Sequence, residues 1–95
     1  KGNFVRDTTG LTQNELNKHL KVYPNPTENT VHVSWEGAEL IEKIVVYDAI
    51  GRAVIKLTDV NDKTEMLDFT SFETGVYIVR IETASNKISR KITKR

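Results

Sequence analysis

The chain has 95 residues, which is enough for one domain with a single modest core. Its residues are 38% hydrophobic and 28% charged, and its formal net charge is +1, so nothing indicates a general attraction to nucleic acid or to an anionic membrane. The sequence contains neither an apolar run of the roughly 20 residues that a membrane helix needs nor an export signal peptide. Cysteine is absent, which excludes disulfide scaffolds, thiolate metal sites and cysteine nucleophiles.

The first 19 residues are polar and are interpreted as a linker. Thr12 and Glu15 have the spacing of a capping box, which favours a short helical turn over residues 13–20. From residue 20 to residue 95 the composition changes to that of a folded domain.

Apolar residues recur with a period of two from Leu20 onward, as in strands that bury one face. Residues 44–47 are apolar throughout, which indicates a strand buried on both sides. Residues 48–51 suit a type I turn that ends in glycine and closes a hairpin. Seven strands are expected, near residues 20–23, 30–35, 44–47, 53–58, 67–69, 76–81 and 87–93. The predicted fold is an all-β, seven-stranded antiparallel immunoglobulin-like sandwich. Its core is expected around Val31, Val33, Ile44, Val46, Ile55, Tyr77, Val79 and Ile81.

The first strand ends at the step Pro24-Asn25-Pro26. Proline cannot donate a backbone hydrogen bond to a sheet, and it restricts the preceding residue to extended conformations. The step is therefore expected to stop the first strand, to form a stiff corner, and to deliver the chain to a second strand in the other sheet.

No catalytic, metal or cofactor site is expected. His19 and His32 have no partners at metal-ligand spacing. Residues 59–62 superficially resemble a calcium loop, but Lys63 stands where an oxygen ligand is needed, so a solvated turn is favoured. No serine lies in a nucleophile-elbow context, and there is no phosphate-binding glycine loop.

The aromatic residues allow two interpretations. Trp35 and the tyrosines could form a sugar-stacking platform, but packing in the core and at a corner is favoured. Tyr77, two residues after Gly75, has the position of the corner tyrosine of immunoglobulin-like sandwiches.

The last nine residues carry five cations and no acid. Ile88 and Ile92 are expected to anchor this final strand while its basic side chains remain in water. The charges could guard an edge strand against aggregation, or they could dock an acidic partner, and the sequence does not separate these interpretations. The cations are Lys87, Arg90, Lys91, Lys94 and Arg95.

Residues 20–95 resemble the type A C-terminal sorting domain of the type IX secretion system of Bacteroidetes. The resemblance rests on residues 22–26 (VYPNP), residues 46–52 (VYDAIGR), residues 75–81 (GVYIVRI) and the basic strand from residue 87. Asp48 stands where asparagine is common in the family, and Asn86 where glycine is common. Both replacements keep the turn-forming character.

The resemblance implies a non-catalytic secretion signal on a cargo protein. The cargo would fold in the periplasm, meet shuttle and outer-membrane translocon components, and reach the cell surface or the medium. A sortase-like cysteine protease would cut within residues 1–19 and could attach the cargo to an anionic lipopolysaccharide. No cofactor or nucleic acid is implied, and self-association through an edge strand stays open. The residues expected to contact the machinery are Pro24, Asn25, Pro26, Asp48, Gly51, Gly75, Tyr77, Lys87, Arg90, Lys91, Lys94 and Arg95.

Two other functions stay open at this point. One is an extracellular carbohydrate- or ligand-binding immunoglobulin-like module, for which Trp35 would be the central residue. The other is an inert immunoglobulin-like spacer.

Overall fold

The computed structural model describes residues 18–95 of the chain. Lys18 and His19 are helical and Leu20 begins the first strand, while the capping box and the rest of the expected helical turn lie outside the described residues. Seven strands follow: β1 (Leu20–Tyr23), β2 (Thr30–Trp35), β3 (Lys43–Tyr47), β4 (Ala53–Leu57), β5 (Thr64–Asp68), β6 (Gly75–Glu82) and β7 (Lys87–Lys94).

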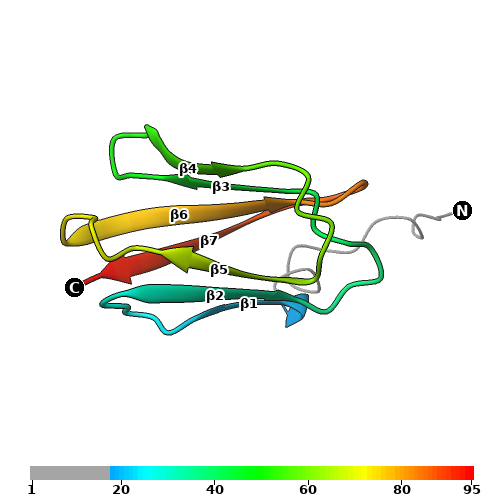
Figure 1. Ribbon diagram of the computed structural model, residues 1–95, viewed down its shortest axis with the longest axis horizontal. Coiled ribbons are helices and arrows are strands. Elements are labelled where there is room, and N and C mark those ends of the chain that lie inside the picture. The colour runs from blue at the N-terminus through cyan, green and yellow to red at the C-terminus, as the bar shows by residue number, and fades with distance from the viewer. Residues whose placement is uncertain (1–17) are drawn as a thin grey trace, which may run out of the picture.

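The strands form two sheets that pack face to face (Figure 1). One sheet has three strands in the order β1-β2-β5, and the other has four in the order β4-β3-β6-β7. All pairs of neighbouring strands are antiparallel. The predicted all-β sandwich is confirmed, and so is the hairpin that joins β3 to β4.

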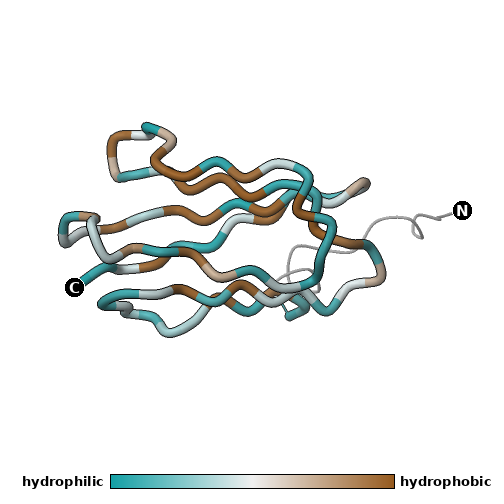
Figure 2. Tube along the Cα trace, in the orientation of Figure 1, coloured by the Kyte–Doolittle hydropathy of each residue, from teal (hydrophilic) through white to brown (hydrophobic). Residues whose placement is uncertain are grey.

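The core lies between the sheets because each strand presents alternate apolar side chains to the inside, an alternation that Figure 2 shows along the tube. Of the eight residues predicted at its centre, seven are buried and Ile55 is half-buried against them. Phe69, which follows β5, is fully buried among them.

The third strand is central in its sheet, with β4 on one side and β6 on the other. Ile44, Val45 and Val46 are all buried, which confirms the prediction that the apolar run 44–47 marks a strand covered on both faces. Val45 points away from the core, and the side chains on the outer face of the sheet cover it.

The prediction that the chain crosses to the other sheet after the first strand is wrong. β2 lies in the same sheet as β1 and pairs with it directly, Val22 opposite Val33. Residues 24–29 leave that sheet only locally, because Thr27 forms a parallel bridge with Lys94 of the other sheet. The two prolines interrupt the β1–β2 hairpin at a bend, and the chain then returns to its own sheet.

Successive strands run in opposite directions, so the connections alternate between two ends of the sandwich. The β1–β2 corner, the β3–β4 turn, the β5–β6 loop and the last residue of β7 lie at one end, on the left in Figure 1. We call this the distal end, because β1 begins at the opposite end.

Candidate functional site at the distal end

Most of the sequence-predicted recognition residues gather at the distal end. The step Pro24-Asn25-Pro26 lies in the β1–β2 corner, and Asp48 and Gly51 lie in the β3–β4 turn. Gly75 and Tyr77 begin β6, and Lys94 and Arg95 end the chain beside them (Figure 1). Lys87 begins β7 at the opposite end. Segments that are far apart in the sequence therefore meet on one end of the molecule.

Asp48 organises the β3–β4 turn. Its carboxylate accepts hydrogen bonds from the backbone amides of Ile50 (3.1 Å) and Arg52 (2.9 Å) and from Arg52 Nε (2.8 Å). These bonds, the Arg52 amide first, hold the pKa of Asp48 below its ordinary value. Gly51 adopts φ of 91°, a left-handed conformation that glycine takes without strain. The Asp48 side chain therefore fixes the conformation of the turn to which it belongs.

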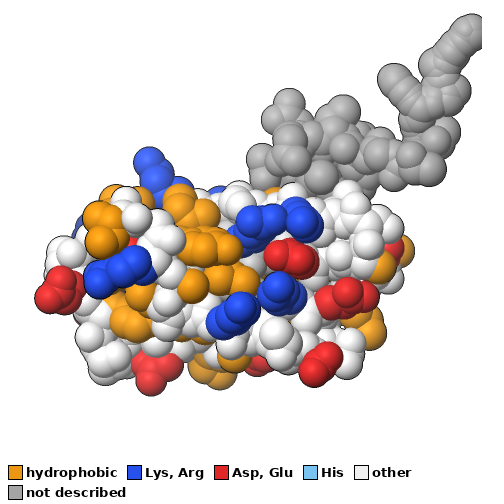
Figure 3. All heavy atoms as spheres, turned by 90° about the horizontal axis from the view of Figure 1, so that it is seen from above, with side chains coloured by type: hydrophobic (Ala, Val, Ile, Leu, Met, Phe, Trp, Pro, Cys, Tyr) orange, Lys and Arg blue, Asp and Glu red, His pale blue; other side chains and the backbone are white. Residues whose placement is uncertain are grey.

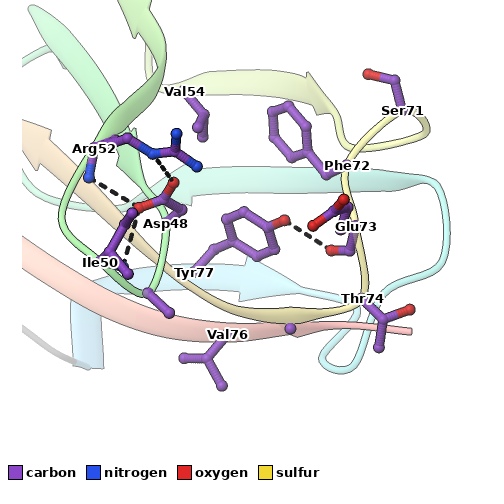
Figure 4. A pocket seen from close by; sticks show the side chains of 12 residues that line it. Asp48, Ile50, Arg52, Val54, Ser71, Phe72, Glu73, Thr74, Val76 and Tyr77 are labelled. Carbon is purple, nitrogen blue, oxygen red and sulfur yellow. Dashed lines mark hydrogen bonds and ion pairs between the residues drawn. The ribbon is translucent and has the colours of Figure 1, made fainter.

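Tyr77 fixes the β5–β6 loop. Its hydroxyl donates to the carbonyl oxygen of Glu73 at 2.7 Å, as Figure 4 shows, and its ring stacks on Phe72 with 5.3 Å between the ring centroids. Phe69 meets both rings edge to face. The arrangement supports the predicted corner tyrosine, since the hydroxyl bonds to backbone four residues upstream.

A cavity of about 420 Å³ lies between the β3–β4 turn and the β5–β6 loop. Ile50, Val54 and Phe72 give it apolar walls, while Arg52 and Glu73 add charge at its margin (Figure 4). Two of the sequence segments that carry the family resemblance, 46–52 and 75–81, contribute residues to this one cavity. A shaped, partly apolar hollow of this kind suits contact with a side chain of a partner.

The Pro-Asn-Pro corner covers the outer edge of β7. Asn25 accepts a hydrogen bond from the Thr93 amide at its Oδ1 (3.1 Å) and approaches the Lys91 carbonyl with its Nδ2 (3.4 Å). The Thr27 amide donates to the Thr93 carbonyl and the Thr27 carbonyl accepts from the Arg95 amide, both at 2.8 Å. An unpaired strand edge is a template for aggregation. The corner therefore ties the two sheets together and closes part of an exposed edge.

The basic side chains of β7 do not all remain in water, so that expectation is wrong for two of them. Lys94 is buried, and its Nζ donates to the Arg95 carbonyl at 2.7 Å. Arg90 is half-buried and donates to the Leu20 carbonyl at 3.0 Å. Strand period explains the difference: Ile88 and Ile92 face the core, so residues 90 and 94 share their face. The exposed cations are Lys87, Lys91 and Arg95.

Trp35 is a core residue. It is 3% exposed, and a side chain at Gly37 would collide with its indole ring. His19 contacts the same ring edge to face. The packing interpretation is supported, and a sugar-stacking surface centred on Trp35 is not, because its ring faces are covered.

The sequence did not identify several residues that shape the distal end. Thr27 is almost fully buried and bonds the Thr30 carbonyl through its hydroxyl at 2.8 Å, yet no motif marks it. Ile50 and Phe72 line the cavity but lie in turn segments, where apolar residues have no periodicity to analyse. The inward direction of Arg90 and Lys94 did have a signal, namely their even spacing from Ile88 and Ile92.

Within residues 18–95, no group of His, Asp and Glu side chains is placed to hold a metal ion. Over the same residues, no helix has both the length and the apolar character needed to cross a membrane. What the distal end offers is backbone shape, an apolar hollow and exposed cations.

The fold is that of a small immunoglobulin-like β-sandwich. Residues 21–95 match the family model described as the secretion system C-terminal sorting domain, and the chain belongs to that family. It is a C-terminal sorting domain of the type IX secretion system, a class of non-catalytic signal that directs export to the cell surface or the medium through the secretion machinery. A comparison with curated proteins finds no match.

Proposed function

We propose that this domain is a folded secretion signal that directs a cargo protein through the outer membrane and is then removed by a sortase-like protease. The cargo would fold in the periplasm and meet shuttle and translocon components there. The observation that carries the proposal is the gathering of the family segments at the distal end, opposite the start of β1. A cargo joined before Leu20 would leave the distal end accessible.

The distal end is proposed as the surface that the machinery contacts. Asp48 and Tyr77 hold their loops by specific hydrogen bonds, so the cavity between them has a fixed shape before any partner arrives. A preformed surface loses less conformational entropy on binding than a flexible one. The exposed cation Lys91 lies on β7, which ends there, and the exposed Arg95 follows that strand.

An export assay tests the proposal. A reporter protein followed by the 95-residue chain is produced in a bacterium with a functional type IX system and in a strain that lacks the translocon. Reporter on the surface or in the medium is expected only with the translocon. Retention of a folded reporter in the periplasm of both strains would contradict the proposed function.

Cleavage is proposed to occur within residues 1–19, before the compact strands begin. A protease needs an extended and accessible segment, and strands paired in a sheet do not provide one. We expect mass spectrometry of the exported reporter to find no peptide that contains Tyr77, and to find a new carboxyl terminus before Leu20. Mature cargo that still carries the sandwich would contradict removal.

A further inference from the structure

The outer face of the four-stranded sheet carries apolar side chains at adjacent positions. On β3, Val45 and Tyr47 alternate with the core residues and so face outward; on β6, Val76 and Ile78 do the same. Figure 4 shows Val76 directed away from Tyr77, its inward-facing neighbour. Tyr47 lies directly opposite Ile78 in the register. Val45 is only 4% exposed and lies beneath its neighbours, so we call Tyr47, Val76 and Ile78 the outer apolar patch.

The central strand of the other sheet shows what a water-facing strand looks like in this protein, although Tyr23 of β1 and Met66 of β5 are exposed on either side of it. The outward positions of β2 are Thr30, His32 and Ser34, all polar. Antiparallel sheets with one solvated face usually place polar residues there, so the outer apolar patch departs from the expected pattern. Ile50 is 75% exposed and Val76 40%, and both line the distal cavity, so apolar surface continues from the patch to the distal end. Contiguous apolar surface of this kind marks interaction sites.

Cations surround the patch. Lys56 and Arg80 lie on either side of Val45 in the register, and Lys91 lies opposite Ile78. Lys43 precedes Val45 on the same face of β3. We call Lys43, Lys56, Arg80 and Lys91 the cationic rim.

Glu82 lies opposite Lys43 in the register and compensates part of the charge of the rim. Glu82, on the same face of β6, lies 3.7 Å from Arg80. Among the described residues Lys43, Lys56 and Lys91 form no ion pair. Figure 3, a view from above, shows hydrophobic side chains gathered on one face, with Lys and Arg side chains and some Asp and Glu side chains around them.

We propose that the outer apolar patch and its cationic rim form a docking face for a segment of the secretion machinery that presents apolar side chains flanked by carboxylates. The inference rests on the proposed function and names the surface and the chemistry of the partner. Covering the patch would desolvate the rim ammonium groups, which is costly unless opposite charges meet them. Carboxylates of the partner that lie against Lys56 and Lys91 would compensate for that cost.

The apolar part is tested with the export reporter. Replacing Val76 and Ile78 by threonine keeps strand propensity and removes the apolar contact. We expect the steady-state amount exported to fall about tenfold, which corresponds to a loss of about 1.4 kcal/mol of binding free energy. The matched control replaces Leu40 and Met66, which are exposed and lie outside the patch and the family segments, by threonine and should export normally. Both proteins should retain the circular dichroism spectrum of the unmodified chain.

The charge is tested separately. Lys56→Glu combined with Lys91→Glu should reduce export at least as strongly as the threonine pair, while Lys56→Arg combined with Lys91→Arg should export normally, because the charge is kept. If both the threonine and the glutamate variants fold and export like the unmodified chain, the docking face is wrong even though the proposed function stands. If the unmodified chain does not export the reporter, both fail.

Binding of a membrane or of a second copy of the chain to the docking face would also overturn the proposal. Cosedimentation of the unmodified chain with phosphatidylglycerol vesicles, abolished by the glutamate pair, would assign the face to a membrane. A concentration-dependent dimer in analytical ultracentrifugation, abolished by the threonine pair, would assign it to a second copy of the chain. Export loss in both variants, with a monomer that does not bind vesicles, supports the acidic protein partner.

Discussion

Single side chains hold the connections of this domain in place. Asp48 closes the β3–β4 turn, Asn25 fastens the corner to β7, and Glu39 joins the β2–β3 connection to the β6–β7 hairpin by accepting from Thr83 Oγ1 and Ser85 Oγ, each at 2.7 Å. The bonds to Thr83 and Ser85 lower the pKa of Glu39. Carboxylate and amide side chains therefore stabilise the loops by hydrogen bonds, as apolar side chains stabilise the core by packing.

Acid should weaken the β3–β4 turn through Asp48. Its folded pKa is lowered, so its stabilising contribution is present above the ordinary aspartate pKa of about 3.9 and is lost as the pH falls below that value through the folded pKa. Asp48→Asn keeps an oxygen acceptor for the two backbone amides but cannot ionise. Thermal melting from pH 7 to pH 2 should show a smaller acid loss for Asp48→Asn than for the unmodified chain. Equal acid losses would contradict this role.

Removing the Asn25 side chain should loosen the β7 edge. Asn25→Ala deletes the acceptor of the Thr93 amide, and we expect about 0.5–1.5 kcal/mol lower stability, near the low end because the bond is exposed. Hydrogen exchange at the Thr93 amide should quicken. Asn29→Ala is the control, since Asn29 lies in the same connection and contacts Phe69 through its backbone carbonyl. Unchanged protection of the Thr93 amide would contradict the role of Asn25.

At the scale of elements, β7 has two chemically different faces. Arg90 and Lys94 point inward beside Ile88 and Ile92, and Lys91 points outward. Inward-facing charge on an edge strand discourages pairing with another chain, because a second strand would bury it. The strand thus combines inward-facing charge that protects its edge with exposed charge at Lys87 and Lys91.

Replacing the two kinds of cation should separate these roles. Arg90→Gln should lower stability by about 1 kcal/mol, because its guanidinium bonds to the Leu20 carbonyl of the other sheet. Lys91→Gln should stay within about 0.5 kcal/mol, as exposed substitutions usually do. Urea unfolding of each variant measures the difference. A larger loss for Lys91→Gln than for Arg90→Gln would contradict the assignment.

At the scale of the whole molecule, one shared core holds the two sheets together. Val46 of β3 and Val79 of β6 are fully buried between them, and Phe69 packs at the distal end of the same cluster. The loops of the distal end depend on this core, since Tyr77 belongs both to the core and to the β5–β6 corner. Loss of core packing should therefore alter the proposed binding surface as well.

Truncating the core should cost far more than truncating the surface. Val46→Ala removes buried methyl groups and leaves a cavity, with an expected loss of about 1–3 kcal/mol. Val76→Ala, 40% exposed on the outer face, should cost well under 1 kcal/mol. Chemical denaturation measures both. Similar losses at the two positions would contradict the assigned directions of the β3 and β6 side chains.

The sequence by itself determined the strands, the antiparallel sandwich, the centre of the core and the turn at residues 48–51. These follow from local chemistry: a period of two in the apolar residues, glycine where φ must be positive, and an aspartate that bonds to its own turn. The inward direction of Arg90 and Lys94 was also available from that period, although the expectation of exposed cations overlooked it.

Tertiary structure alone decided which sheet receives β2, what covers the edge of β7, and which loops share the distal cavity. Each of these depends on contacts between segments far apart in the chain, such as Asn25 with Thr93 and Arg90 with Leu20. Local preferences do not specify such contacts, because the same pattern of alternating strands is compatible with several sheet orders. The favoured order is the one that satisfies the backbone groups of the edge and buries both apolar faces together.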